Sequence, residues 1–294
     1  MKKAIFKGAG VAIVTPFNDS GINLDEFGRI IEDQISKGTD AIVVTGTTGE
    51  SATMSDEEHR CAIKFVVDKV KHRIPVIAGT GSNETVYAVK LTEYAKEVGA
   101  DAALVVTPYY NKCTQKGLVR HYNMIADVGL PVILYSVPSR TGVSFKTETY
   151  KELSKHPNIA AVKEANGDLT SVLRTRYACG DELHIYSGND DQIVPILSLG
   201  GKGVISVLSN VAPKTVHDIC ALYFDGKTEE AGKLQIDYSD LIDALFCEVN
   251  PIPVKTAMRL MGFEVGKLRL PLTDPEEKSL EQIKKALKNH GLLK

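Results

Sequence analysis

The chain has 294 residues, of which 43% are hydrophobic, and it carries 35 basic and 37 acidic residues for a formal net charge of −2. The two charge types are interspersed, which argues against a nucleic-acid-binding face, and no apolar run approaches the ~20 residues that a membrane-spanning helix needs. The five cysteines form no C-x-x-C pair and the seven histidines form no H-E-x-x-H motif. We therefore expect reduced thiols in a cytoplasmic protein, with no metal site.

Short apolar segments rich in valine, isoleucine and alanine recur along the chain and predict eight strands, over 10–17, 40–46, 75–81, 102–108, 131–138, 159–165, 184–188 and 203–210. Their continuous apolar character is typical of parallel strands that are buried on both faces. Amphipathic segments of helical length lie between them; one follows a capping box at Ser55–Glu58 and another begins near Ser82–Thr85.

Eight successive βα units predict an α/β fold, the (β/α)8 TIM barrel. The alternative is an open dinucleotide-binding sheet, suggested by "GAGVAI" at 8–13. That stretch lacks the third glycine of the fingerprint and continues into a strand instead of opening a helix, so the barrel is favoured.

The C-terminal part of the chain predicts three helices, over 228–246, 251–262 and 275–290. The last is expected to open with Asp274, followed by Pro275 at the first helical position. We therefore expect a catalytic barrel over 1–224 and a C-terminal helical extension over 225–294. The extension would pack against the barrel or against a neighbouring subunit.

Barrel enzymes carry their chemistry at the carboxyl ends of the strands. The polar residues expected at that end include Thr47, Thr48, Tyr109, Tyr110, Tyr135, Arg140 and Lys163. Paired carboxylates for glycoside hydrolysis are missing from this set, as are the aspartate and histidine ligands of a metal-dependent barrel. What remains is amine chemistry, in which a lysine attacks a carbonyl group to form an imine while hydroxyl groups move protons.

Lys163 is the centre of this hypothesis because it stands at the end of an apolar strand. Burial disfavours the charged ammonium, and only the neutral amine is a nucleophile. The alternative is a rim salt bridge to Glu164, although adjacent strand residues point to opposite faces. Arg140 has the planar fork that suits a substrate carboxylate, and "GTTGE" at 46–50 offers hydroxyls and backbone amides. "GTGSN" at 79–83 suggests a phosphate cradle, but no other residues converge on that interpretation.

Five motifs occur in order along the chain, namely "GTTGES" (46–51), "TPYYN" (107–111), "YSVPSRTG" (135–142), "VKEA" (162–165) and "GGKGVISV" (200–207). Together they resemble the class I, Schiff-base pyruvate aldolases related to N-acetylneuraminate lyase, and most nearly the dihydrodipicolinate synthase family. The resemblance covers nearly the whole chain. It implies an imine between Lys163 and pyruvate, whose enamine attacks L-aspartate 4-semialdehyde on the route to diaminopimelate and lysine. It implies no cofactor and no metal.

The resemblance also assigns catalytic roles. It implies that Tyr135 donates and accepts protons and that Thr47 links it to Tyr110. In the family that last tyrosine enters the active site of the adjacent subunit, so a dimer would be the smallest complete unit. Most members are tetramers built as a dimer of dimers, and the sequence leaves dimer and tetramer open.

Four further residues match substrate-binding positions of the family. Thr48 and Ile205 would hold pyruvate, largely through backbone groups. Arg140 would bind the carboxylate of the semialdehyde, and Gly188 would lie near the Schiff base. Ser136 replaces the usual asparagine after the strand-five tyrosine, a change expected to alter a local turn and not the chemistry.

The lysine-feedback site of the family matches only in part, at Ser51, Ala52, His59, Asn83 and Tyr109. Asp56 stands where inhibited bacterial enzymes tend to carry histidine, and Tyr87 where they carry glutamate. Because the missing carboxylate removes a partner for the effector's ammonium group, we expect weak or absent inhibition by lysine.

Three other classes of function compete with this one. N-acetylneuraminate lyase and the 2-keto-3-deoxy sugar-acid aldolases share the lysine and the tyrosine, but Arg140 would have little to pair with in a sialic-acid pocket. A non-catalytic barrel paralogue would have no reason to keep the whole reactive set. A metal- or phosphate-dependent isomerase lacks its ligands.

Overall fold

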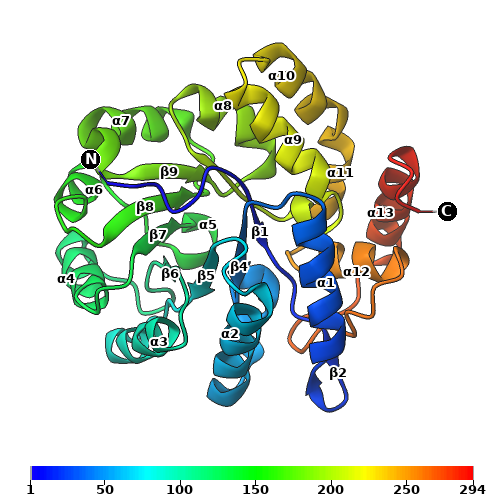
Figure 1. The fold of residues 1–294 in the computed structure, drawn as a ribbon, viewed down its shortest axis with the longest axis horizontal. Helices are drawn as coiled ribbons and strands as arrows, with labels where there is room; N and C mark the ends of the chain where they lie inside the picture. Colours follow the sequence, from blue (N-terminus) through cyan, green and yellow to red (C-terminus); the bar gives the residue numbers. More distant parts are fainter. Residues whose placement is uncertain (1, 294) are drawn as a thin grey trace.

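Eight parallel strands close into a barrel at the centre of the molecule, with helices around it (Figure 1). The computed structural model describes residues 2–293. The barrel strands are β1 (Gly8–Ala12), β4 (Ala41–Val44), β5 (Val76–Gly79), β6 (Ala102–Val106), β7 (Val132–Ser136), β8 (Ile159–Glu164), β9 (His184–Ser187) and β10 (Gly203–Ser206). Each of the eight lies within or close to a segment predicted from its apolar run, and the TIM barrel is confirmed. A small antiparallel ribbon, β2 (Phe17–Asn18) and β3 (Gly21–Ile22), follows the first strand.

The outer layer consists of α1 (Leu24–Ser36), α2 (Asp56–Val70), α3 (Thr85–Glu97), α4 (Gln115–Ala126), α6 (Thr147–Leu153), α7 (Leu169–Cys179), α8 (Ile193–Ser198) and α9 (Pro213–Phe224). A short helix, α5 (Pro138–Thr141), follows β7. The predicted capping box is present, because the Ser55 hydroxyl accepts the Glu58 N–H at 3.2 Å and the Glu58 carboxylate accepts the Ser55 N–H at 3.1 Å. Apolar side chains fill the space between the strands and this layer.

The barrel is closed and plugged at its amino-terminal end. Gly8 of β1 pairs with Gly203 of β10, and a Cβ at Gly203 would lie 1.9 Å from the Gly8 carbonyl oxygen, so this seam requires glycine. The Phe6 ring stacks on Tyr186 at a centroid distance of 4.3 Å, and the Tyr186 hydroxyl donates to the Phe6 carbonyl at 2.7 Å. The chemistry-bearing end of the barrel is therefore the opposite one.

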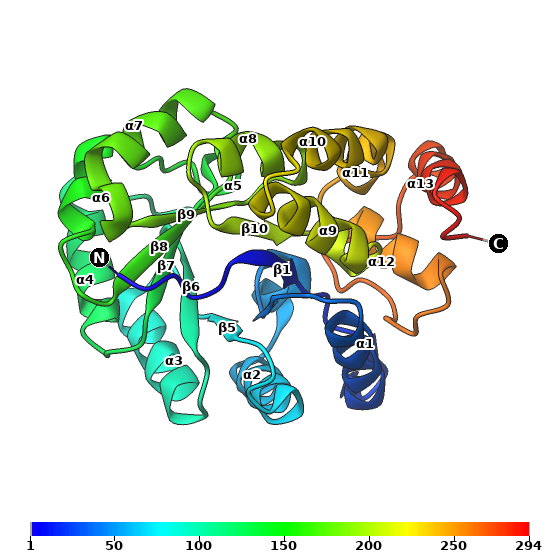
Figure 2. The same ribbon diagram turned by 45° about the horizontal axis from the view of Figure 1, so that its top comes forward.

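Four helices form the C-terminal part: α10 (Thr228–Asp237), α11 (Ser239–Leu245), α12 (Ile252–Leu260) and α13 (Glu277–Asn289). Figures 1 and 2 place α12 and α13 on the side of the barrel where α1 and α9 lie. No helix within residues 2–293 is long and apolar enough to cross a membrane.

Two helix boundaries differ from those expected. The single helix predicted over 228–246 is divided at Tyr238, whose ring stacks on His290 at 4.1 Å, so α11 turns to pack on α13. The prediction that Asp274 opens the last helix is wrong. Its carboxylate accepts from Arg259 of α12 at 2.5 Å, and α13 begins three residues later with Glu276 as its N-terminal flanking residue.

Candidate active site

A cavity of about 210 Å³ opens at the carboxyl ends of the barrel strands. Most of the predicted catalytic and substrate-binding residues line it, namely Thr47, Thr48, Tyr135, Arg140, Lys163 and Gly188. The residues come from the ends of β4, β7, β8 and β9 or from the loops directly after them. Parallel pairing brings the strand ends to one edge, so side chains far apart in sequence share one wall.

Lys163 is the last residue but one of β8. Its side chain lines the cavity and the residue is only 6% exposed. It pairs in register with Tyr135 of β7, and its Nζ lies 4.4 Å from the centre of the Tyr135 ring. The neighbouring Glu164 faces the helix layer, where its carboxylate accepts from the Tyr150 hydroxyl at 2.7 Å. The alternative of a rim salt bridge between the two neighbours is therefore wrong, because strand alternation sends them to opposite faces.

The loop after β4 brings threonine hydroxyls to the cavity. Residues Thr47–Gly49 form a single helical turn, and the Thr15 hydroxyl donates to the Gly49 carbonyl at 2.8 Å, which fixes the turn against the segment that follows β1. The Thr48 side-chain oxygen accepts from the Asn250 amide at 3.0 Å. The loop is thus held by contacts from both ends of the chain.

Arg140 lies on the short helix α5, which opens with Pro138 at its first position. Its Nη2 donates to the backbone carbonyl of Asn250 at 2.9 Å. Phe246 and Asn250, both from the segment between α11 and α12, complete the cavity wall. Sequence reasoning missed these two residues, since they stand outside any strand end and no spacing marks them.

Two predicted active-site residues, Ile205 and Tyr110, lie outside the cavity wall. Ile205 of β10 is fully buried in the barrel interior, and Val207 lines the cavity in its place. Tyr110 is 91% exposed on the loop after β6 and has a positive φ of 68°. The adjacent Tyr109 is 39% exposed. Within one chain, the hydroxyl-bearing ring of Tyr110 faces solvent rather than Tyr135.

Asp190 is a buried carboxylate that sequence reasoning also missed. Its Oδ2 accepts the backbone N–H groups of Val207 and Leu208 at 3.0 and 2.9 Å, which ties the loop after β9 to the loop after β10. Burial raises the pKa of Asp190, and hydrogen bonds and the Lys163 charge oppose that shift. Its place beside Gly188 and Asn189 could be foreseen only from the barrel geometry.

Residues matching the family's effector positions lie on or near α2 and α3. His59 is buried, with its Nε2 2.8 Å from the Gly79 carbonyl oxygen, and burial lowers its pKa. The Asp56 carboxylate accepts from the Tyr87 hydroxyl at 2.8 Å and from Arg60 at 2.7 Å. Burial and the Asp56 hydrogen bond raise the pKa of Tyr87 to about 12. The two residues that depart from the family pattern are therefore bonded to each other.

The remaining titratable side chains offer no metal centre, because residues 2–293 contain no group of three or more histidine, cysteine or acidic side chains placed to hold an ion. The five cysteines are free thiols at separate places in the fold. The chemistry of the cavity thus rests on an amine, a guanidinium group, hydroxyls and backbone groups.

Residues 5–290 match the model of the dihydrodipicolinate synthetase family. The chain is 55% identical to the 4-hydroxy-tetrahydrodipicolinate synthase of Acetivibrio thermocellus, over 100% of both chains. Its structure is similar to that of dihydrodipicolinate synthase from Thermotoga maritima, with a TM-score of 0.96 and 42% identity over 99% of this chain and 100% of that one. It is also similar to the Acinetobacter baumannii enzyme complexed with pyruvate, with a TM-score of 0.95 and 44% identity over 98% and 99% of the two chains. The chain belongs to the dihydrodipicolinate synthetase family.

Proposed function

We propose that this protein is a 4-hydroxy-tetrahydrodipicolinate synthase that condenses pyruvate with L-aspartate 4-semialdehyde. The observation that carries the proposal is the buried amine of Lys163 at a strand end, in register with Tyr135, in a cavity that also contains Arg140. The relatives that share its full length carry the same activity in their names. These residues suit imine chemistry, which needs a dry amine and a proton carrier.

The first half of the reaction takes place on Lys163. Its amine attacks C2 of pyruvate, and loss of water from the resulting carbinolamine gives an iminium ion. Loss of a proton from C3 then gives the enamine, which is the carbon nucleophile. The centre of the Tyr135 ring lies 4.4 Å from the Lys163 Nζ, so Tyr135 is the residue placed to carry these protons. Thr48 and backbone groups of the loop after β4 would hold the pyruvate carboxylate.

The second half joins the enamine to the aldehyde. C3 of the enamine attacks the aldehyde carbon, whose oxygen takes a proton and becomes the 4-hydroxyl group. The amino group of the semialdehyde then attacks C2 and releases the Lys163 amine, which closes the ring. Arg140, with one Nη group bonded to Asn250, has its remaining donors for the carboxylate of the semialdehyde.

The proton path supports an oligomer. Thr47 lines the cavity, while Tyr110 is 91% exposed and projects away from it. We infer that Tyr110 serves the site of an adjacent subunit, where Thr47 links it to Tyr135. A set of exposed apolar side chains on α7, formed by Leu169, Leu173 and Tyr177, supports further association into a dimer of dimers.

The setting proposed for this enzyme is the cytoplasm, since its five cysteines are free thiols. The proposed substrates are small charged acids, which suit a polar cavity of about 210 Å³.

The test is intact mass spectrometry after borohydride treatment, with and without pyruvate, on the unmodified protein and on Lys163→Ala. We expect a pyruvate-sized adduct on the unmodified protein and none on the variant. Turnover with L-aspartate 4-semialdehyde then identifies the acceptor. An adduct accompanied by turnover of N-acetylneuraminate or 2-keto-3-deoxy sugar acids, and none of the semialdehyde, would assign the protein to a related lyase instead.

A further inference from the structure

One residue of the C-terminal segment touches both groups proposed to bind the substrate carboxylates. Asn250 is 7% exposed and lines the cavity between α11 and α12. Its side-chain amide donates to the Thr48 hydroxyl oxygen at 3.0 Å, and its backbone carbonyl accepts from Arg140 Nη2 at 2.9 Å. The loop after β4 and the helix after β7 are therefore joined through a single residue that belongs to neither.

These contacts determine which hydrogen-bond donors remain for substrate. A hydroxyl group that accepts from an amide keeps its own O–H free, so Thr48 can donate into the cavity. A guanidinium group has five N–H donors in a rigid fork, and fixing one arm on a carbonyl aims the others. Asn250 thus leaves the Thr48 O–H group and the other Arg140 N–H groups free to donate into the cavity. Its two hydrogen bonds also fix the orientation of both side chains.

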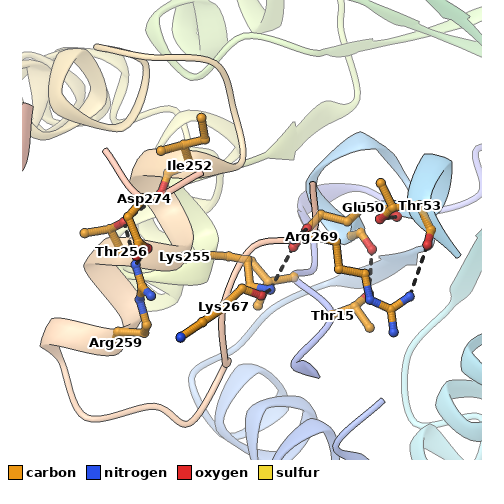
Figure 3. A network of polar contacts seen from close by, with 12 residues as sticks. Thr15, Glu50, Thr53, Ile252, Lys255, Thr256, Arg259, Lys267, Arg269 and Asp274 are labelled. Atoms are coloured by element: carbon orange, nitrogen blue, oxygen red, sulfur yellow. Dashed lines mark hydrogen bonds and ion pairs between the residues drawn. The ribbon is translucent and has the colours of Figure 1, made fainter. Parts of the chain in front are cut away.

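A second contact fixes the segment that carries Asn250. Glu50 lies two residues after Thr48, and its Oε1 is 2.7 Å from the Lys255 ammonium of α12, with both side chains fully buried (Figure 3). The other oxygen of Glu50 accepts the backbone N–H of Arg269 at 3.1 Å, and the Lys255 ammonium also donates to the Lys267 carbonyl at 3.3 Å. Burial lowers the pKa of Lys255 and the Glu50 charge opposes that shift.

The loop after β4 is consequently attached at two points to the segment formed by Asn250 and the start of α12. The two attachment points are close together in sequence in both segments. Asn250 stands five residues before Lys255, and Thr48 stands two before Glu50. Glu50 has a left-handed backbone with φ of 57°, and its side chain reaches Lys255 of α12. A buried ion pair adds little net stability compared with apolar residues. Here the contact of 2.7 Å between Glu50 and Lys255 ties the loop after β4 to α12.

We propose that Asn250 is a positioning residue that orients Thr48 and Arg140 toward the two substrate carboxylates. The buried pair of Glu50 and Lys255 holds Asn250 in place. The C-terminal helices would then set substrate affinity, although they supply no reacting group. This inference rests on the proposed function and names the part of the same site that the barrel does not build.

The first test is Asn250→Ala, assayed for KM and kcat with each substrate. Loss of the hydrogen bond to Thr48 is expected to raise the KM for pyruvate about tenfold while kcat changes less. In a Thr48→Val background the same substitution should add little, because the group it orients is already gone. The isosteric Asn250→Asp, which cannot donate, should resemble Asn250→Ala; full affinity in this variant would overturn the donor role.

The second test is the double variant Glu50→Gln with Lys255→Met, which avoids leaving a lone buried charge. We expect a folded protein with a raised KM for the semialdehyde, because the carbonyl that holds Arg140 is no longer fixed. Arg259→Met is the matched control, since it removes an ion pair to Asp274 from the outer side of the same helix. Its KM values should stay within about twofold of the unmodified protein.

The outcomes separate the two proposals. If the unmodified protein forms no borohydride-trapped adduct with pyruvate, the proposed function fails. If the adduct forms and turnover is normal, but Asn250→Ala and the double variant both keep their KM values within about twofold, the positioning role is refuted and the function stands. Should the double variant fail to fold, Asn250→Ala and its Thr48→Val cycle still decide the question.

Discussion

The hydrogen bond between Tyr150 and Glu164 of β8 gives a quantitative prediction. Tyr150 is fully buried, and its hydroxyl donates to the Glu164 carboxylate at 2.7 Å on the face of β8 opposite Lys163. Burial raises the pKa of Tyr150, so the hydroxyl stays protonated and acts as the donor. Tyr150→Phe removes this donor and keeps the ring that stacks on Phe145. A hydrogen bond to a charged group contributes about 1.5–3 kcal/mol, so we expect that loss in the free energy of unfolding at alkaline pH, where Glu164 is ionised.

The loss should depend on pH in a defined direction. Burial raises the pKa of Glu164 above its ordinary value, and the hydrogen bond from Tyr150 opposes that shift. A raised pKa in the folded state means that stability is present at low pH and is lost as pH rises through that pKa. Without the hydroxyl the pKa rises further, so the variant loses more stability than the unmodified protein as the pH rises through this titration, compared between an acid and an alkaline pH. Where the carboxyl is protonated in both proteins, a neutral hydrogen bond of about 1 kcal/mol is all that separates them.

Tyr122→Phe is the matched control. Tyr122 is also fully buried, but its hydroxyl donates to the neutral backbone carbonyl of Val105 at 3.0 Å. We expect a loss of about 1 kcal/mol that is the same at both pH values. Urea unfolding followed by circular dichroism gives the free energies at each pH. Equal losses in the two variants at high pH, or a Tyr150→Phe loss that does not vary with pH, would refute the assignment of Glu164 as a buried carboxylate.

Three further predictions concern substrate, subunits and effector. Arg140→Met should raise the KM for the semialdehyde at least about tenfold and leave pyruvate trapping by borohydride intact; loss of trapping would place Arg140 at the pyruvate carboxylate instead. Lys163→Ala and Tyr110→Phe, each impaired alone, should recover activity when co-expressed, because a mixed dimer contains one intact site, whereas no recovery argues against a shared site. Lysine at about 1 mM should inhibit weakly or not at all, since Asp56 and Tyr87 are bonded to each other, and the double change Asp56→His with Tyr87→Glu should increase inhibition. Strong inhibition of the unmodified protein at submillimolar lysine would contradict this.

Most of the barrel could be predicted from the sequence, because a strand buried on both faces has a continuous apolar run that can be recognised without knowing its neighbours. The sequence also placed Lys163 in the cavity, since side chains alternate along a strand whatever surrounds it. Asn250 could not be predicted in the same way. It stands in a segment between helices, and its importance comes from two residues more than 100 positions away. The break at Tyr238 has the same cause, because stacking on His290 outweighs a helical pattern that is otherwise unbroken.

The two faces of β8 also explain why the stability prediction bears on function. A slip of one residue in the register of β8 would exchange its faces and send Glu164 into the cavity and Lys163 into the helix layer. In the observed register Lys163 pairs with Tyr135, and Glu164 reaches the Tyr150 hydroxyl and the Asn166 N–H. In the slipped register the carboxylate would lose those donors, and a buried amine would replace the acceptor to which Tyr150 and Asn166 are bonded. The contact between Tyr150 and Glu164 therefore favours a register in which Lys163 faces the cavity.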